Sequence, residues 1–157
     1  MPSSQANTAP HPAAQWLALD RQLCFALYSA SLAMTKLYKP LLAPLGLTYP
    51  QYLVMLVLWE HGATGVSALG DRLHLDSGTL TPLLKRLEAQ ALVRRTRSRD
   101  DERRVEVTLT EAGQALREKA LAVPPAVACA TQCELTEISQ LTQRLSALRS
   151  QLSQAAA

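Results

Sequence analysis

Residues 76–110, DSGTLTPLLKRLEAQALVRRTRSRDDERRVEVTLT, contain the stretch that decides the fold. It opens with small residues that commonly cap helices, and four leucines follow at spacings of three and four, which predicts a helix with one apolar face. After Gln90, two β-prone runs at residues 92–95 and 105–109 flank a highly charged turn. The stretch therefore predicts a helix followed by a β-hairpin with a basic tip.

Positive charge is concentrated in this part of the chain. Eight of the sixteen Lys and Arg residues fall between Lys85 and Arg104, against four acidic residues in the same interval. Such clustering suits the binding of phosphates. A polar-faced helix can enter the major groove of DNA, and an Arg-tipped hairpin can reach the adjacent minor groove. We therefore expect double-stranded DNA as a partner.

Pro82 sets the expected start of the helix, because proline has no N–H and is tolerated in the first helical turn. We expect the helix to begin near Thr79, which would place Pro82 in that turn. The residues that we expect to read base edges are Ser77, Thr79 and Thr81. The residues that we expect to hold phosphates are Lys85, Arg86 and Arg97.

The run DERRVEVTLT, residues 101–110, and the helix SGTLTPLLKRLE before it resemble the winged-helix motif of multiple antibiotic resistance regulator (MarR) type transcription factors. The resemblance implies a mainly α protein with a small β-wing, a winged helix-turn-helix that acts as a homodimer. In that family the wing Arg, here Arg103, enters the minor groove and is held by the wing Asp, here Asp101.

The composition fits one mostly helical domain, because Leu and Ala are abundant and only one Phe is present in 157 residues. The N-terminus lacks the features of a signal peptide and no apolar run has membrane length, so we expect a cytoplasmic protein without a membrane partner. Residues 1–14, rich in Pro, Ser and Ala, are expected to form a disordered tail. No ligand spacing predicts a metal, and we expect no cofactor.

The apolar pattern also predicts the other helices. From Trp16, apolar residues recur at steps of three and four, which predicts one long helix ending near residues 40–44. Residues 49–61 are apolar nearly all round and predict a buried helix that begins with a capping box of Thr48 and Gln51. A short amphipathic segment at residues 66–73 completes a helix-turn-helix.

The C-terminal third is expected to be helical as well. Thr110 is a suitable cap for a helix that Pro124 and Pro125 must interrupt. The last leucines recur at alternating steps of three and four, a narrow seam that is typical of helix pairing. We therefore expect residues 15–48 and 110–157 to form a helical dimerisation region, with the winged helix-turn-helix at residues 49–109. A two-fold dimer would match a palindromic operator.

Three cysteines leave a redox role open, since their odd number argues against a secreted disulfide scaffold. Residues 23–52, including LYKPLL and LGLTYPQYL, resemble the organic hydroperoxide resistance regulator (OhrR) subgroup of the MarR family. The resemblance implies a reactive cysteine at Cys24 that accepts hydrogen bonds from the hydroxyls of Tyr38 and Tyr49. Phenol donors favour the thiolate, which attacks peroxides.

Helix geometry places a condition on that contact. Fourteen residues at about 1.5 Å each put Tyr38 roughly 21 Å along the helix axis from Cys24. The two side chains cannot touch within one straight helix. If Tyr38 does bond to Cys24, it must therefore belong to the other subunit of a dimer.

Cys129 and Cys133 are candidates for a second thiol. They stand four residues apart, and a shared helix would present both sulfurs to one side. One branch of the resembled subgroup has a C-terminal resolving cysteine at the position of Cys129. The resemblance implies an intersubunit disulfide from Cys24 to Cys129, and Cys133 is a possible second resolving residue. Both cysteines could instead be packing residues.

The sequence thus predicts a DNA-binding repressor, not an enzyme, with an organic hydroperoxide as its inducer. Oxidation of Cys24 and the disulfide to Cys129 would release the operator. One alternative is a MarR-type regulator that responds to a non-covalently bound phenolic or lipid-like ligand. Another is a thiol peroxidase, which would leave the basic hairpin unexplained.

Overall fold

The structure of the chain is a computed structural model that describes residues 16–97 and 105–156. The chain divides into two compact units, Met1–Leu37 and Tyr38–Ala157. The expected N-terminal tail and the tip of the hairpin lie outside the described residues. The wing residues Asp101 and Arg103 belong to that tip, so their expected roles stay predictions.

The first unit contains a short 3-10 helix, η2 (Leu19–Arg21), and most of α1 (Leu23–Leu42). The prediction of one helix from Trp16 was wrong at its start. Ala18 and Gln22 have extended backbone on either side of η2, and the Gln22 side-chain amide donates to the Trp16 carbonyl. The apolar spacing continues through these short turns, so periodicity alone could not reveal the break. The helix ends at Leu42 as predicted.

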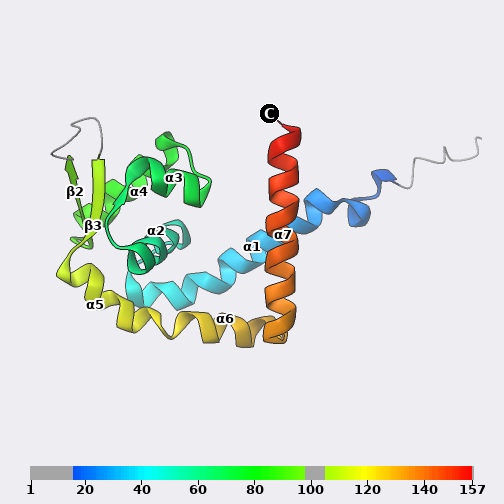
Figure 1. Ribbon diagram of the computed structural model, residues 1–157. Coiled ribbons are helices and arrows are strands. Elements are labelled where there is room, and N and C mark those ends of the chain that lie inside the picture. The colour runs from blue at the N-terminus through cyan, green and yellow to red at the C-terminus, as the bar shows by residue number, and fades with distance from the viewer. Residues whose placement is uncertain (1–15, 98–104, 157) are drawn as a thin grey trace, which may run out of the picture. The chain divides into compact units, whose positions relative to one another are not determined.

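The core of the second unit is built around α2 (Tyr49–His61). After η3 (Ala43–Leu45), the capping box forms as predicted, and the Thr48 backbone N–H donates to Gln51 Oε1 at 2.9 Å. Both Val54 and Met55 are fully buried, which confirms the prediction of a buried helix. Figure 1 shows α2 beside α3, α4 and the hairpin.

The helix-turn-helix consists of α3 (Val66–Leu73) and α4 (Ser77–Ala89). His74 ends α3 with a left-handed backbone (φ 54) and begins the turn that leads into α4. The predicted late start of α4 was wrong, because Asp76 caps the helix and Pro82 lies inside it. Proline removes the hydrogen bond to the Gly78 carbonyl. Gly78 is exposed, so water can satisfy that group.

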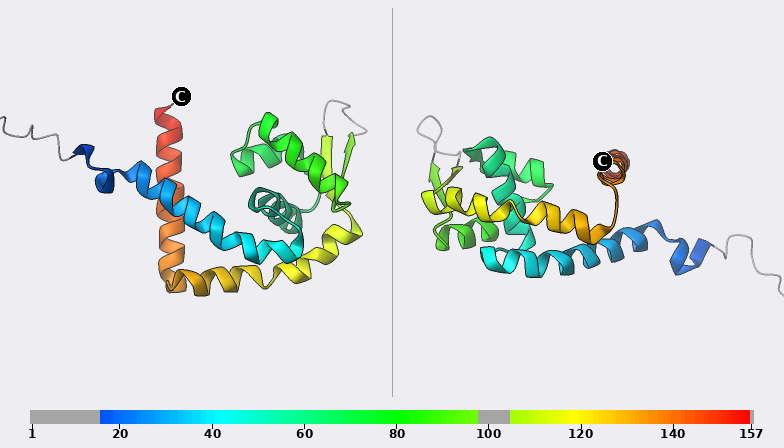
Figure 2. Two further views of the ribbon diagram at one scale, coloured as in Figure 1. Left: turned by 180° about the vertical axis from the view of Figure 1, so that it is seen from behind. Right: turned by 90° about the horizontal axis from the view of Figure 1, so that it is seen from below.

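A three-stranded antiparallel sheet has the strand order β1-β3-β2. Figure 2 shows its two longer strands next to these helices. The strands β2 (Val93–Arg97) and β3 (Val105–Leu109) pair as the predicted hairpin, with Val93 opposite Leu109. The third strand, β1 (Thr64–Gly65), pairs with β3 and was not predicted. Two residues are too few to give a period-2 signal. The result is a mainly α winged helix-turn-helix with a small β-wing.

Three helices complete the chain: α5 (Glu111–Ala120), α6 (Val123–Thr131) and α7 (Leu135–Ala155). Thr110 caps α5 as predicted, and its side chain accepts from the Gly113 N–H at 3.0 Å. The two prolines interrupt the helix as predicted, since they occupy the first turn of α6. Within the described residues, no single helix has both the length and the apolar character that crossing a membrane requires.

Candidate DNA-binding surface and cysteine site

The helix α4 has one buried face and one exposed face. Leu80, Leu84 and Leu87 are at most 1% exposed and join the core. On the other face Ser77, Thr79, Lys85 and Arg86 are exposed, and Thr81 is half-buried. All five predicted residues on α4 therefore lie outside the arc of the helix that the buried leucines occupy. The arrangement leaves this face open to a partner such as a DNA groove.

Hydrogen bonds fix the first turn of α4. The Asp76 carboxylate accepts from the Thr79 backbone N–H at 2.8 Å and from the Thr79 hydroxyl at 3.0 Å. These bonds hold the pKa of Asp76 below its ordinary value. The Thr81 hydroxyl donates to the Ser77 carbonyl at 2.7 Å. Both threonines thus use their hydrogens within the helix, and they offer a methyl group and an acceptor oxygen to a base edge.

The hairpin adds Arg97, which is exposed at the end of β2. Alternation along a strand puts Val93, Arg95 and Arg97 on one face. Val93 is 2% exposed, so this is the face that turns toward the core. Arg97 is the last residue of this row that the structure describes, and its contact with a phosphate stays a prediction.

Sequence reasoning missed an ion pair between α4 and β2. The guanidinium of Arg95 donates to Glu88 Oε2 from Nε at 2.9 Å and from a terminal nitrogen at 2.6 Å. The Arg95 backbone N–H also donates to Glu88 Oε1 at 3.1 Å. These contacts hold the pKa of Glu88 below its ordinary value. The pair joins the end of α4 to the start of the hairpin, and only its seven-residue spacing across a helix end could have hinted at it.

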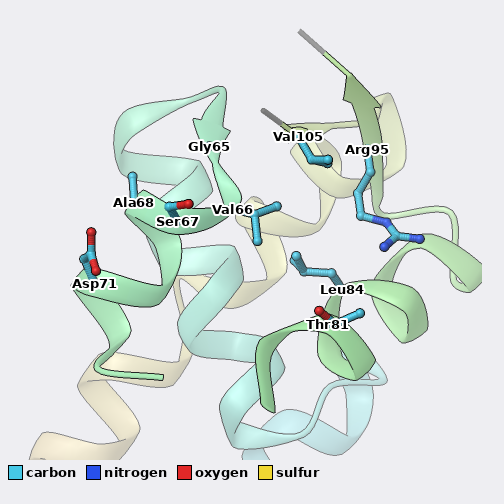
Figure 3. A pocket seen from close by; sticks show the side chains of 9 residues that line it. All are labelled: Gly65, Val66, Ser67, Ala68, Asp71, Thr81, Leu84, Arg95 and Val105. Atoms are coloured by element: carbon cyan, nitrogen blue, oxygen red, sulfur yellow. The ribbon is translucent and has the colours of Figure 1, made fainter. Parts of the chain in front are cut away.

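Arg95 also borders an open pocket between α3, α4 and the hairpin (Figure 3). Its side chain extends toward Leu84 and Thr81 of α4, and Val66 and Val105 line the same hollow. Polar and apolar groups are mixed there. Thr81 both lines this open pocket and belongs to the exposed face of α4.

A cluster of tyrosines lies at the start of the second unit. The ring centroids of Tyr38 and Tyr49 are 4.6 Å apart, and those of Tyr38 and Tyr52 are 6.0 Å apart. Burial, with a smaller contribution from the neighbouring phenols, raises the pKa of Tyr38, and burial raises the pKa of Tyr49. Both phenols therefore keep their protons at neutral pH. Tyr52 is a member of this cluster that sequence reasoning missed.

The hydroxyls of Tyr38 and Tyr49 make no hydrogen bond to any residue that the structure describes. Both residues are half-buried. A pair of adjacent phenols thus presents two O–H donors at the surface of the second unit. Such donors suit an anionic acceptor.

The three cysteines are free thiols. Cys24 is exposed near the start of α1, and Cys129 is exposed in α6. The expectation that Cys129 and Cys133 share a helix was wrong. The helix ends at Thr131 and Gln132 turns with φ 54, so Cys133 lies in the turn before α7, where its S–H donates to the Thr131 carbonyl at 3.4 Å. The left-handed residue was not visible in the apolar pattern.

Comparison with known proteins agrees with this architecture. Residues 36–120 match the family described as Transcriptional regulator SarA/Rot. The organic hydroperoxide resistance transcriptional regulator of Bacillus subtilis strain 168 is 49% identical over 136 residues, which cover 87% of this chain and 92% of that protein. The chain belongs to the MarR family of transcriptional regulators. Its resemblance to the organic hydroperoxide resistance group is confirmed as well.

This MarR-family regulator is also similar to solved structures of AbfR from Staphylococcus epidermidis. Reduced AbfR bound to DNA has a TM-score of 0.78 at 36% identity, covering 91% of this chain and 98% of AbfR. Disulfide-formed AbfR has a TM-score of 0.61 at 39% identity, covering 85% of this chain and 94% of AbfR. The relatives are transcriptional regulators, so the regulator is not an enzyme and the thiol peroxidase alternative is excluded.

Proposed function

We propose that the chain is a dimeric repressor that senses organic hydroperoxides through Cys24 and releases its operator when Cys24 forms an intersubunit disulfide with Cys129. The observation that carries the proposal is the pair of half-buried phenols, Tyr38 and Tyr49, whose hydroxyls lack an acceptor among the described residues. The name of the relative from B. subtilis and the solved disulfide form of AbfR support the same chemistry.

The phenols find their acceptor in a second copy of the chain. Cys24 lies fourteen positions before Tyr38 in α1, too far for contact along one helix. In the dimer the Cys24 thiolate of one subunit accepts from the phenols of the other. The raised pKa values of Tyr38 and Tyr49 support this role, because a phenol must keep its proton to donate.

The redox step is a two-electron oxidation of sulfur. The Cys24 thiolate attacks the terminal oxygen of the hydroperoxide, an S–O bond forms, and the O–O bond breaks. The alkoxide that leaves takes a proton and departs as an alcohol, and the sulfur is left as a sulfenic acid. The thiol of Cys129 from the partner subunit then attacks this sulfur. A disulfide forms, and water leaves with the thiol proton.

Cys129 is the better resolving residue because it is exposed at the end of α6 with no hydrogen bond to a described residue from its sulfur. The S–H of half-buried Cys133 is engaged by the Thr131 carbonyl. The Cys133 thiol is therefore less available than that of Cys129, and Cys133 is the second candidate for the resolving residue. A disulfide needs the two Cα atoms within about 7 Å, so its formation moves the helices that carry the thiols.

The DNA side of the proposal uses the exposed face of α4 and the hairpin. Ser77, Thr79 and Thr81 read base edges in the major groove, since they occupy the exposed start of the recognition helix. Lys85, Arg86 and Arg97 hold phosphates, and Arg103 supported by Asp101 enters the minor groove. In a two-fold dimer the two recognition helices read a palindromic operator, and a change in their separation weakens binding.

The test combines a non-reducing gel with operator binding. Purified protein is treated with one equivalent of cumene hydroperoxide beside Cys24→Ser, Cys129→Ser and Cys133→Ser variants. We expect a covalent dimer band and operator release in the wild type and in Cys133→Ser. Neither effect is expected in Cys24→Ser, and the band is expected to disappear in Cys129→Ser. A wild type that keeps its operator while Cys24 is oxidised would refute the proposal and favour a regulator of the ligand-binding type.

A further inference from the structure

Tyr52 and Trp59 connect the phenol pair to a distant part of the same unit. Tyr52 is 3% exposed, and its ring lies 6.0 Å from that of Tyr38. The ring of Trp59 meets the Tyr52 ring edge-on, with centroids 6.3 Å apart. The Trp59 indole N–H donates to the Gly113 carbonyl at 2.9 Å, across 54 positions of sequence. Packed aromatic contacts thus run from the phenols to the first turn of α5.

Gly113 stands at the base of the wing. The backbone N–H of Thr110, at the end of β3, donates to the Leu92 carbonyl at 3.1 Å. The Thr110 hydroxyl donates to the Ala91 carbonyl at 2.6 Å and accepts from the Gly113 N–H. A Cβ on Gly113 would lie 2.0 Å from the Leu92 oxygen, so the first turn of α5 is in close backbone contact with the residue just before β2. The residues at both ends of the hairpin therefore contact the first turn of α5 at Gly113, whose carbonyl accepts the hydrogen bond from Trp59.

We infer that Tyr52 and Trp59 are positioning residues that couple the state of the Tyr38–Tyr49 pair to the base of the DNA-binding wing. The inference rests on the proposed function, because the phenols must change their acceptor when Cys24 is oxidised. A closely packed interior has discrete arrangements, so movement of the Tyr38 ring displaces Tyr52 and then Trp59. The indole hydrogen bond transfers that displacement to Gly113, and the hairpin shifts with it.

A purely structural role for Trp59 makes a different prediction. If the indole N–H only stabilised the fold, its loss would lower stability and would affect operator binding equally in the reduced and oxidised states. The coupling role predicts a change in the ratio of the two affinities. This ratio, the operator Kd after oxidation divided by the Kd before it, is the quantity to measure.

The experiment compares Trp59→Phe, which keeps a ring and removes the donor, with Trp16→Phe as its matched control. Trp16 is 63% exposed and belongs to the other unit. We expect the affinity ratio to fall about fivefold in Trp59→Phe, the change that one net hydrogen bond allows. Trp16→Phe keeps the wild-type ratio. Tyr52→Leu lowers the ratio as well, whereas Tyr52→Phe retains the ring contacts and the ratio.

Fluorescence gives a second readout, because the chain has two tryptophans and the Trp16→Phe variant reports on Trp59 alone. Its emission is expected to change when cumene hydroperoxide is added, and not to change in a Cys24→Ser background. Loss of the Cys24 thiol is followed in the same samples. If Trp59→Phe oxidises and keeps the wild-type ratio, the coupling role is refuted while the proposed function stands. If peroxide leaves operator binding of the wild type unchanged, both fail together.

Discussion

Gly113 is the residue at which the packing of the wing base leaves no room for a side chain. Its Cβ position lies 2.0 Å from the Leu92 carbonyl oxygen, which is backbone and cannot rotate away. Gly113→Ala is therefore expected to lower the free energy of unfolding by about 1–3 kcal/mol, as overpacking commonly does. Urea denaturation measures the change. Gly65→Ala is the control, because its Cβ would meet nothing within 4 Å; an equal loss in both variants would contradict the argument.

Single residues also mark the limit of what the sequence could tell about the site. The exposed positions of Ser77, Thr79 and Lys85 followed from helical spacing, because the leucines fix which face is buried. Tyr52 and Arg95 were missed for a physical reason. Each has a partner in another element that only tertiary packing brings close, Tyr38 of α1 for the former and Glu88 of α4 for the latter. Spacing within one element carries no signal of such contacts.

At the scale of elements, the Arg95–Glu88 pair makes the joint between α4 and β2 sensitive to pH. The folded state lowers the pKa of Glu88, so its stabilising contribution is present above the ordinary pKa of a glutamate and is lost as the pH falls through the lowered value. Glu88→Gln is expected to reduce the dependence of Tm on pH in that acidic range. Glu106→Gln, an exposed residue of β3 without an ion pair among the described residues, is the control. An unchanged slope in Glu88→Gln would contradict the expectation.

The exposed face of α4 allows a prediction about salt dependence. Arg86→Ala is expected to weaken operator binding and non-operator binding by similar factors, because a phosphate contact carries no sequence information. The slope of log Kobs against log salt should become shallower by about 0.9, the effect of one phosphate contact. Lys119→Ala removes an equal charge from the exposed side of α5 and should leave the slope unchanged. Fluorescence anisotropy with labelled operator measures both.

The starts and ends of the helices show how much of the fold the spacing of apolar residues can predict. The helices with strong caps, α2 at Thr48 and α5 at Thr110, begin where the sequence predicted. The errors lie where local backbone chemistry overrides the apolar pattern. Extended backbone at Gln22 delays α1, and the cap formed by Asp76 starts α4 early in spite of Pro82. At α4 a short-range hydrogen bond to the Asp76 side chain, not the burial of leucines, sets the start of the helix.

At the scale of the molecule, the two long helices α1 and α7 expose apolar side chains that a partner surface could cover. No residue of α7 is buried, and in α1 only Leu42 is. Leu141, Leu145 and Leu152 of α7 are between 46% and 56% exposed. Apolar side chains repeated at helical spacing stabilise a protein only when another surface covers them. We propose a second copy of the chain as this partner, because the proposed intersubunit disulfide also requires one.

Leu145→Glu tests this dependence of operator binding on dimerisation. Burial of one leucine stabilises by about 1.5–3 kcal/mol, and a two-fold interface contains two copies, so the dimer Kd is expected to rise at least about a hundredfold. Gln143→Glu adds the same charge at an exposed position of α7 outside the leucine seam and should leave the dimer intact. Light scattering over a range of concentrations measures the mass. Operator affinity should fall in parallel with dimer content, because one recognition helix alone reads only half of a palindrome. A monomeric Leu145→Glu variant that retained full operator affinity would show that the two half-sites are bound independently. The proposal that the disulfide releases the operator by changing the separation of the two recognition helices would then be refuted.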